Sequence, residues 1–405
     1  MAEAVNDYLW HKYGQRRELD AHTIARYERG AVRWPNQSYR EALSAVLNAT
    51  ESELGFVPTR RRRAQDHGPD GTLAVNLFSP FDLAVVPGKY LQPGVAEGKP
   101  VIRVGVSEVE QVQRATREAA SQENLHGGGA ANADAGEQLA RFIPYLDGRA
   151  SPTARRALLE AVGNLAGVAG YAAFDIGDYQ LAEQRFRLAL WCADTAGSWE
   201  LRASTLADMA RKTAYVGNPD GALSLIELAQ VRSDRLSATA RAMLSALRAQ
   251  YLATLGRTDD ALTEVARADE HFADRSPGTD APWLCFYDEA EHLGSTGKAL
   301  MPVARTRKRL DLAAVRIRRA VALQGSAYPR SRTFSLTRLA ILTMQLDDPR
   351  EAANLGLQAV EQAISFHSER IHGELRALAA AAAPRRRLAE VAELRNSIAD
   401  TVAAR

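Results

Sequence analysis

The chain is poor in cysteine and in long apolar runs, and each shortage excludes a class of protein. Its two cysteines, Cys192 and Cys285, are too far apart for a CxxC metal knuckle and too few for a disulfide framework, which favours a reducing compartment. No apolar run approaches the roughly 18 residues that cross a bilayer. Residues 1–10 carry Glu3 and Asp7 where a secretory signal would be basic. We expect a cytoplasmic protein with no membrane partner.

Net charge is also nearly absent, because 51 Lys and Arg residues are balanced by 49 Asp and Glu residues in a chain of 405. A surface that is basic throughout is therefore excluded, and any contact with nucleic acid must be local. Apolar residues make up 46% of the chain, which is enough to build a core and excludes disorder as its general state. Few of the basic residues are lysines, so an arginine cluster is a weaker signal here than usual.

Common signatures of enzymes are missing as well. The sequence has no GxSxG motif and no dinucleotide fingerprint, and the glycines of 126–129 lack the lysine and hydroxyl of a phosphate-binding loop. His367 and His372 are five residues apart and do not share a helix face. The carboxylates of 288–291 beside His292 have the spacing of a solvated helix face. We predict no enzyme, no metal and no cofactor, and a flexible joint at 126–129.

Three segments differ in composition. Residues 1–57 are mixed in character and contain several aromatic residues. Residues 58–107 contain four consecutive arginines and many prolines and glycines, which predict a linker with short extended segments at 73–78 and 101–106. Residues 108–405 are rich in Ala, Leu, Glu and Arg at helical spacing. The predicted fold class is all-α.

The third segment repeats a pattern of small residues. A turn glycine is followed by alanine after five residues, an apolar residue after four more and alanine after another three, as in Gly177, Ala182, Phe186 and Ala189. The first alanines of five such sets stand at 182, 222, 261, 313 and 352, and a further small residue lies twelve before most of them. Small residues let two helices cross closely, and a turn glycine ends the first helix. The pattern predicts stacked helical hairpins.

This pattern resembles tetratricopeptide repeats, and residues 177–189 match best, although the period here is near 40 instead of 34. The resemblance implies a right-handed α-solenoid over residues 108–405, and a HEAT-like array of similar period is the alternative. The first helix of each hairpin would line the concave face. There we predict a peptide or protein ligand, since an amide can bond both the N–H and the C=O of a peptide. The residues predicted to hold it are Asn164, Tyr171, Asp175, Arg211, Tyr215 and Gln250.

Residues 1–57 predict three helices, over 2–10, from the N-cap Asp20 to Arg29, and over 38–47. The run 20–30, followed by Arg33-Trp34-Pro35 and by 39–43, resembles the lambda-repressor-like (XRE) helix-turn-helix family. The head followed by repeats resembles actinobacterial members of that family that carry a tetratricopeptide-type tail. A complete domain of the family has one more helix before Ala2, so the resemblance implies that the first helix is missing from this chain.

The same resemblance implies which residues meet double-stranded DNA. The helix that begins near Asp20 would be the recognition helix in the major groove. Base contacts would come from its first turns and phosphate contacts from the residues that follow. The residues concerned are His22, Thr23 and Arg26 for bases, and Arg29 and Arg33 for phosphates. From their charge alone, Arg60, Arg61, Arg62 and Arg63 are further candidates for phosphate contacts, and a solvated linker is the alternative.

Two functions are compatible with these features. The first is a homodimeric transcriptional regulator in which a ligand in the repeat groove alters the spacing of two DNA-binding heads. The alternative is a tetratricopeptide-like scaffold or adaptor that no longer binds DNA. Local charge bears on this choice, because residues 1–57 hold seven Lys and Arg residues against eight Asp and Glu residues, a balance of −1.

Overall fold

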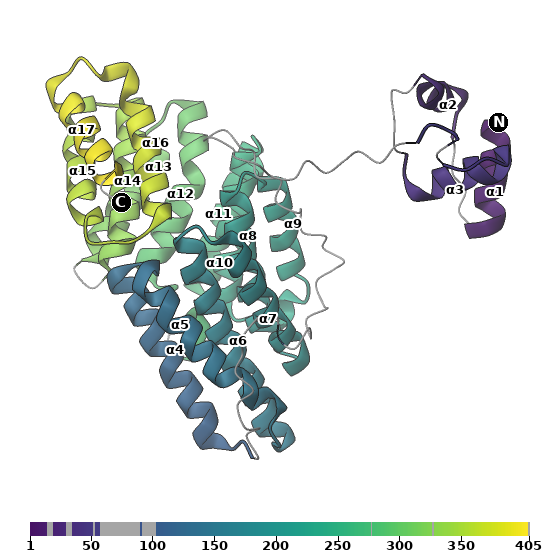
Figure 1. Ribbon diagram of the computed structural model, residues 1–405. Helices are drawn as coiled ribbons and strands as arrows, with labels where there is room; N and C mark the ends of the chain where they lie inside the picture. The colour runs from purple at the N-terminus through teal and green to yellow at the C-terminus, as the bar shows by residue number, and fades with distance from the viewer. Residues whose placement is uncertain are drawn as a thin grey trace. The chain divides into compact units, whose positions relative to one another are not determined.

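The computed structural model divides into two units, Met1–Leu73 and Ala74–Arg405 (Figure 1). It describes residues 1–13, 19–29, 35–51, 53–56, 90, 103–276, 278–325 and 328–403. These residues form α-helices and short 3₁₀-helices and no strand, which confirms the all-α prediction. Two extended segments were predicted. Residues 73–78 lie outside the described residues, and of 101–106 the structure describes 103–105, which belong to no helix or strand, and Val106, where α4 begins.

The head, as we call the first unit, contains the three predicted helices α1 (Ala2–Tyr13), α2 (Ala21–Glu28) and α3 (Gln37–Leu47). Asp20 is the N-cap of α2, and its Oδ1 accepts a hydrogen bond from the Thr23 amide at 2.7 Å. Val5, Leu9, Ile24 and Leu43 are buried together and join the three helices.

The repeat unit, as we call the second unit, consists of consecutive helices packed in pairs (Figure 1). The first helix of each pair is α4, α6, α8, α10, α12, α14 or α16, and these are called the first helices below. The pairs are α4 (Val106–His126) with α5 (Gly128–Phe142), α6 (Pro152–Asp175) with α7 (Tyr179–Ala196), α8 (Trp199–Tyr215) with α9 (Pro219–Ala229), α10 (Ala238–Thr254) with α11 (Thr258–Ala273), α12 (Glu289–Arg307) with α13 (Asp311–Gln324), α14 (Pro329–Leu346) with α15 (Pro349–Ala363), and α16 (Glu369–Ala382) with α17 (Ala389–Ala403).

The small residues of the sequence repeat lie where two helices of a pair cross. The repeat alanines, such as Ala182 and Ala222, are fully buried, and the glycines that precede the first three sets, Gly177, Gly217 and Gly256, have φ between +81° and +92°. Gly170 packs on the ring of Phe186, so that a Cβ there would lie 2.7 Å from the nearest ring carbon. The prediction of helical hairpins joined by glycine turns is confirmed.

One helix of the repeat unit is unusually apolar. Among the described residues, α6 alone has the length and hydropathy of a membrane span, yet 67% of its most apolar window is buried inside the protein. It packs against α4, α5 and α7. A helix surrounded in this way has the character of the core helix of a globular protein.

The two ends of the repeat unit contact each other, because α14 and the start of α16 pack against α4, α5 and α6 (Figure 1). Asp175 at the end of α6 is fully buried and pairs with Arg330 of α14. Ser368, the N-cap of α16, donates to Asp175 Oδ1 at 2.8 Å. Arg330 also lies 3.2 Å from Glu123 of α4. These residues, with Gly128, form what we call the closure cluster.

The joint between α4 and α5 belongs to this cluster. The Gly128 amide donates to Asp175 Oδ2 at 2.9 Å, and a Cβ at Gly128 would lie 2.6 Å from the carbonyl oxygen of Ala172. Gly127, at φ +78°, packs on the backbone of His367. The predicted joint between two helices at 126–129 is confirmed, but its glycines are closely packed instead of flexible. Its glycines allow the backbone to approach neighbouring helices closely.

Close packing at Gly170 can be tested by adding one methyl group. Gly170→Ala forces a Cβ against the buried ring of Phe186, and we expect it to lower the free energy of unfolding by about 1–3 kcal/mol. Gly167→Ala, one turn earlier in α6, has open space around its Cβ and should raise that free energy by about 0.5–1 kcal/mol. Urea unfolding measures both. Equal midpoints for the two variants would contradict the predicted contact.

Closure can be tested at Asp175. Asp175→Ala leaves the buried guanidinium of Arg330 with less compensation, so the free energy of unfolding should fall by about 3–5 kcal/mol. Amide hydrogen exchange should accelerate in α4 and α16 before it does in α10. The matched control is Asp234→Ala, because Asp234 pairs with Arg232 on the open surface and its loss should leave the urea midpoint unchanged. Similar behaviour of the two variants would show that closure is weak.

Candidate ligand-binding site

Two cavities lie on the side of the repeat unit formed by the first helices. One has a volume of about 570 Å³ and is lined by α4, α6, α8, the 3₁₀-helix η4 (Pro282–Leu284), and residues around the starts of α12 and α14. We call it the acidic cavity, because five carboxylates and three guanidinium groups line it. These residues are Glu123, Glu160, Asp208, Asp288 and Glu291, with Arg117, Arg211 and Arg330.

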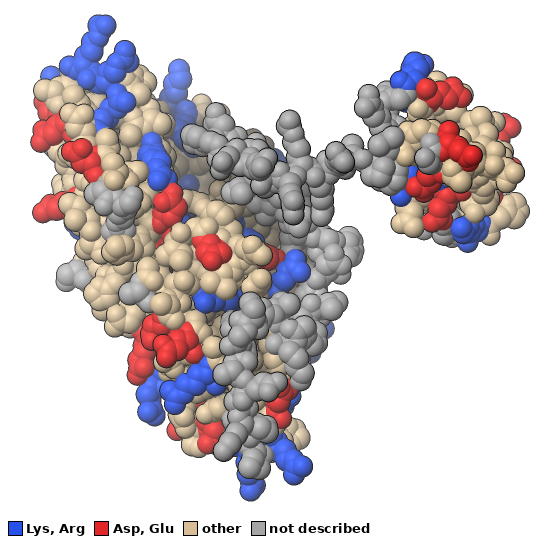
Figure 2. Space-filling model, viewed as in Figure 1, with Lys and Arg blue, Asp and Glu red and all other residues tan. Residues whose placement is uncertain are grey.

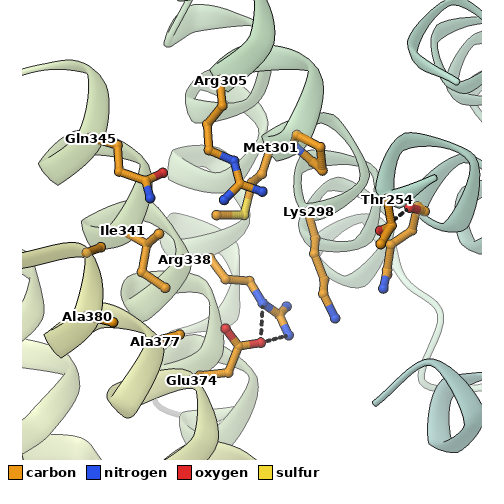
Figure 3. Close-up of a pocket in the computed structure, with 13 residues that line it drawn as sticks. Thr254, Lys298, Met301, Arg305, Arg338, Ile341, Gln345, Glu374, Ala377 and Ala380 are labelled. Atoms are coloured by element: carbon orange, nitrogen blue, oxygen red, sulfur yellow. Dashed lines mark hydrogen bonds and ion pairs between the residues drawn. The ribbon is translucent and has the colours of Figure 1, made fainter. Parts of the chain in front are cut away.

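The other cavity has a volume of about 540 Å³ and is lined by α10, α12, α14 and α16. We call it the basic cavity, because Lys298, Arg305 and Arg338 line it together with one carboxylate, Glu374. Figure 3 shows these side chains extending into the same space from the surrounding helices. The helices that line both cavities are mainly first helices, as the repeat pattern predicts for a concave face.

Four of the six predicted groove residues line these cavities. Asn164, Tyr171 and Arg211 line the acidic cavity, and Gln250 lines the basic cavity. Asp175 lines neither, because its carboxylate is fully buried in the closure cluster. Tyr215 also lies outside both; its ring packs edge-on against Phe174 and its hydroxyl donates to the carbonyl oxygen of Glu369 at 3.4 Å. The spacing of the repeat therefore predicted the helices that line the cavities correctly. It was wrong for the last residues of α6 and α8, Asp175 and Tyr215, which lie outside both cavities.

Burial shifts the pKa values of ionisable groups in and beside the acidic cavity. Asp208 and Arg211 stand one turn apart on α8 and form an ion pair of 2.7 Å. Burial raises the pKa of Asp208 against the opposing effect of Arg211. The nearby Tyr251 is fully buried, burial raises its pKa, and its hydroxyl has no hydrogen-bond partner among the described residues. Polar groups buried without a partner are rare in folded proteins, which favours a ligand or water nearby.

Two neutral side chains in the wall of the acidic cavity each have a polar atom without a hydrogen-bond partner in the described part of the chain. The atoms are Gln324 Oε1 at the end of α13, an acceptor, and Trp283 Nε1 in η4, a donor. Both side chains line the cavity, and neither was predicted. The sequence signal was weak, because Trp283 stands between repeats and the hairpin of Gln324 shows only part of the repeat pattern.

An aromatic and cationic group stands between the acidic cavity and the closure cluster. Arg370 of α16 donates to the Tyr171 hydroxyl at 2.9 Å and lies over the rings of Tyr171 and Phe174 at 5.0 and 4.7 Å. Its NH1 is also 3.8 Å from Asp175 Oδ1. Arg370 therefore contacts both Tyr171, which lines the acidic cavity, and Asp175 of the closure cluster.

The basic cavity has unequal charges. Both Nε and NH2 of Arg338 donate to one oxygen of Glu374, at 3.1 and 3.0 Å (Figure 3). Burial opposes ionisation of Glu374, but Arg338 and Lys298 hold its pKa below the ordinary value. Burial, followed by repulsion from Arg338, lowers the pKa of Lys298 to about 7. The sequence did not indicate this cluster, because its members come from three different hairpins.

Of the carboxylates at 288–291, predicted to form a solvated face, Glu289 is exposed and Asp288 and Glu291 are partly exposed. Asp288 is the N-cap of α12, but His292 is 3% exposed and stacks on the ring of Phe272 with centroids 4.1 Å apart. Its Nε2 lies 2.8 Å from Asp269 Oδ1. Burial opposes ionisation of Asp269, but His292 and Arg316 lower its pKa. This group joins α11 to α12 and α13.

In the head, three of the nine residues predicted for DNA lie on α2, and a fourth, Arg29, is its C-cap. His22, Arg26 and Arg29 are exposed, and Thr23 is partly exposed. Acidic and basic side chains are mixed on the face of the head that Figure 2 shows. Arg33 and the arginines of 60–63 lie outside the described residues.

Comparison of the chain with protein-family models, with curated proteins and with solved structures finds no match in any of the three. Within the described ranges, no group of three or more His, Cys, Asp or Glu side chains could hold a metal ion. The side chains that line the two cavities provide hydrogen-bond donors and acceptors, guanidinium groups, carboxylates, one lysine and aromatic rings. In binding sites, polar groups of these kinds fix the orientation of organic ligands.

Proposed function

We propose that this protein is a cytoplasmic transcriptional regulator whose repeat unit binds a peptide on its concave face and whose head binds double-stranded DNA. The observation that supports it most directly is the pair of cavities lined by the first helices of successive hairpins. A groove built from stacked hairpins is how helical-repeat proteins bind extended ligands. The tetratricopeptide-like character of these hairpins is part of the proposal and rests on the spacing of small residues.

The shape of the acidic cavity favours a linear ligand. Along α6 its lining runs from Ala157 to Tyr171, which is about 21 Å at 1.5 Å per residue. A fully extended peptide of about six residues covers that length. Asn164 lies midway along this stretch and can accept from and donate to a peptide backbone. Trp283 and Phe286 offer aromatic surface to side chains of the ligand.

The head would supply the DNA contact. An eight-residue helix, α2, presents His22 and Arg26 on its exposed side, and the N-terminal part of such a helix fits the major groove. Two heads in a homodimer would then read two half-sites about one helical turn apart. Ligand binding would act by favouring one arrangement of the dimer over another.

The second candidate is a scaffold or adaptor that binds a protein in the same groove and no DNA. The observation in its favour is the charge of residues 1–57, which is −1 and gives little attraction to phosphates. The two candidates share the peptide groove and differ in the head. One experiment on the groove and one on the head therefore separate them.

The groove is tested with random hexapeptides. Peptides retained by the full chain should bind Asn164→Ala about tenfold more weakly, because the backbone loses two hydrogen bonds of about 0.5–1.5 kcal/mol each. Asn396→Ala, an exposed amide on α17, should bind as the wild type does. Fluorescence anisotropy with a labelled peptide measures the three constants. Retention of no peptide, or equal losses in both variants, would exclude the proposed groove.

The head is tested with duplexes enriched from a random pool by the full chain. Arg26→Ala should lose about 1–3 kcal/mol of binding free energy and tolerate more bases at one position. Arg26→Lys keeps the charge and loses bidentate contact with a base, so it should relax sequence preference to a similar degree. Lys12→Ala on α1 removes the same charge and should keep the preference. If no sequence is enriched between about 50 and 200 mM salt, DNA binding is excluded and the scaffold is the function that the groove experiment then tests.

A further inference from the structure

The basic cavity holds more positive charge than its own carboxylate can neutralise. Three cationic side chains, Lys298, Arg305 and Arg338, line it with one carboxylate, Glu374. Arg338 uses two of its donors on that carboxylate. Neither Lys298 nor Arg305 has a carboxylate within ion-pair distance in the part of the chain that the structure describes. The cavity therefore has two cations available for an anionic ligand.

The surroundings of Lys298 disfavour its charged form. Its surroundings are groups from three other helices: Arg338 on α14, Glu374 and Arg370 on α16, and Arg211 on α8. Removal from water and repulsion by these guanidinium groups lower the pKa of Lys298 to about 7, and Glu374 opposes them only in part. An ammonium kept among cations without a counterion is unfavourable. A bound anion would reverse that unfavourable balance.

The rest of the wall suits the end of a peptide. Pro302 lies inside α12 and lines the cavity. Because proline has no amide proton, the carbonyl of Lys298, four residues earlier, lacks its helical donor and can accept from a ligand N–H. Ala377 and Ala380 of α16 and Met301 of α12 give an apolar surface beside the cations. An anionic group, a backbone amide and an apolar side chain can all be accommodated.

The two cavities follow one another along the same helices. On α12, Glu291 lines the acidic cavity and Lys298 the basic one; on α14, Ser331 and Arg338 do the same. Each pair is seven residues apart, which is about 10 Å along a helix. Three extended residues cover that distance. The change from acidic to basic lining along this line sets a direction for a peptide with charged ends.

We propose that the basic cavity binds the C-terminal carboxylate of the peptide, with Lys298 and Arg305 as its cationic partners and the carbonyl of Lys298 as the acceptor for its last amide. This inference rests on the proposed peptide-binding function and adds a direction to it. The amino end of the peptide lies toward the acidic cavity, where carboxylates outnumber guanidinium groups.

The test is a double-mutant cycle on a hexapeptide retained by the full chain. The peptide is made with a free C-terminal carboxylate and as the C-terminal amide, and each form is titrated against wild type and Lys298→Met. Wild type should bind the amide about 10- to 100-fold more weakly than the acid, as expected for loss of a charged hydrogen bond. Lys298→Met should bind the two forms within about threefold of each other.

Lys308→Met is the matched control. Lys308 is exposed just beyond the end of α12, and its replacement should leave the preference for the free acid intact. Equal binding of acid and amide by wild type would overturn the inference while leaving the peptide groove standing. A preference for the acid that persists undiminished in Lys298→Met would also overturn it. If neither form binds wild type, the proposed function fails and the inference fails with it.

Inorganic phosphate separates a carboxylate site from a general oxyanion site. Millimolar phosphate should displace the free-acid peptide only weakly, because the apolar wall and the Lys298 carbonyl add nothing to its binding. Phosphate that binds wild type as tightly as the peptide does, and is lost in Lys298→Met, would overturn the carboxylate assignment.

The pH dependence gives a readout that a merely structural lysine would not. The ammonium form of Lys298 binds the carboxylate, and it is present below its pKa of about 7. Affinity for the free acid should therefore fall about tenfold between pH 6 and pH 8, while affinity for the amide stays constant. Calorimetry in buffers of different ionisation enthalpy should show proton uptake near pH 7.5. A free acid whose affinity does not change with pH would contradict the inference.

Discussion

The ion pair between Asp175 and Arg330 is the contact on which the arrangement of the repeat unit depends. Its residues are 155 positions apart, and they join the end of α6 to the start of α14. A solenoid of hairpins normally has contacts only between neighbours. Here the same carboxylate also accepts from Ser368 of the last hairpin and from the Gly128 amide of the first. Extra donors of this kind help a buried pair, because the desolvation of two buried charges can exceed their Coulombic gain.

Closure has an electrostatic consequence for the face that the first helices line. Contact between α14, α16, α4 and α6 keeps water away from side chains that would be solvated on an open array. Burial accordingly dominates the behaviour of Asp208, Tyr251 and Lys298, and shifts each toward its uncharged form. Hydrogen bonds and charge pairs between this face and a ligand gain strength for the same reason.

The sequence predicts local and periodic features well, and it predicts closure poorly. Fully buried Ala182 and Ala222 recur at a fixed spacing, so the hairpins and their turns could be read from one chain. Asp175 has the same phase as a groove residue, and only contacts with residues 155 and 193 positions later show that it is buried. Nothing in the local pattern marks such a partner. Lys298 was missed for a related reason, because its environment comes from α8, α14 and α16.

Arg370 connects closure with both cavities. It lies 3.8 Å from Asp175 in the closure cluster, donates to Tyr171 in the acidic cavity, and contributes to the low pKa of Lys298 in the basic cavity. A ligand that neutralises charge in either cavity changes the electrostatic balance at this guanidinium. The ligand can favour the closed arrangement only by as much as it binds that arrangement better than an open one. A peptide that reaches both cavities gains from both only while α16 stays against α6. Any coupling between such a ligand and closure would therefore act through the guanidinium of Arg370.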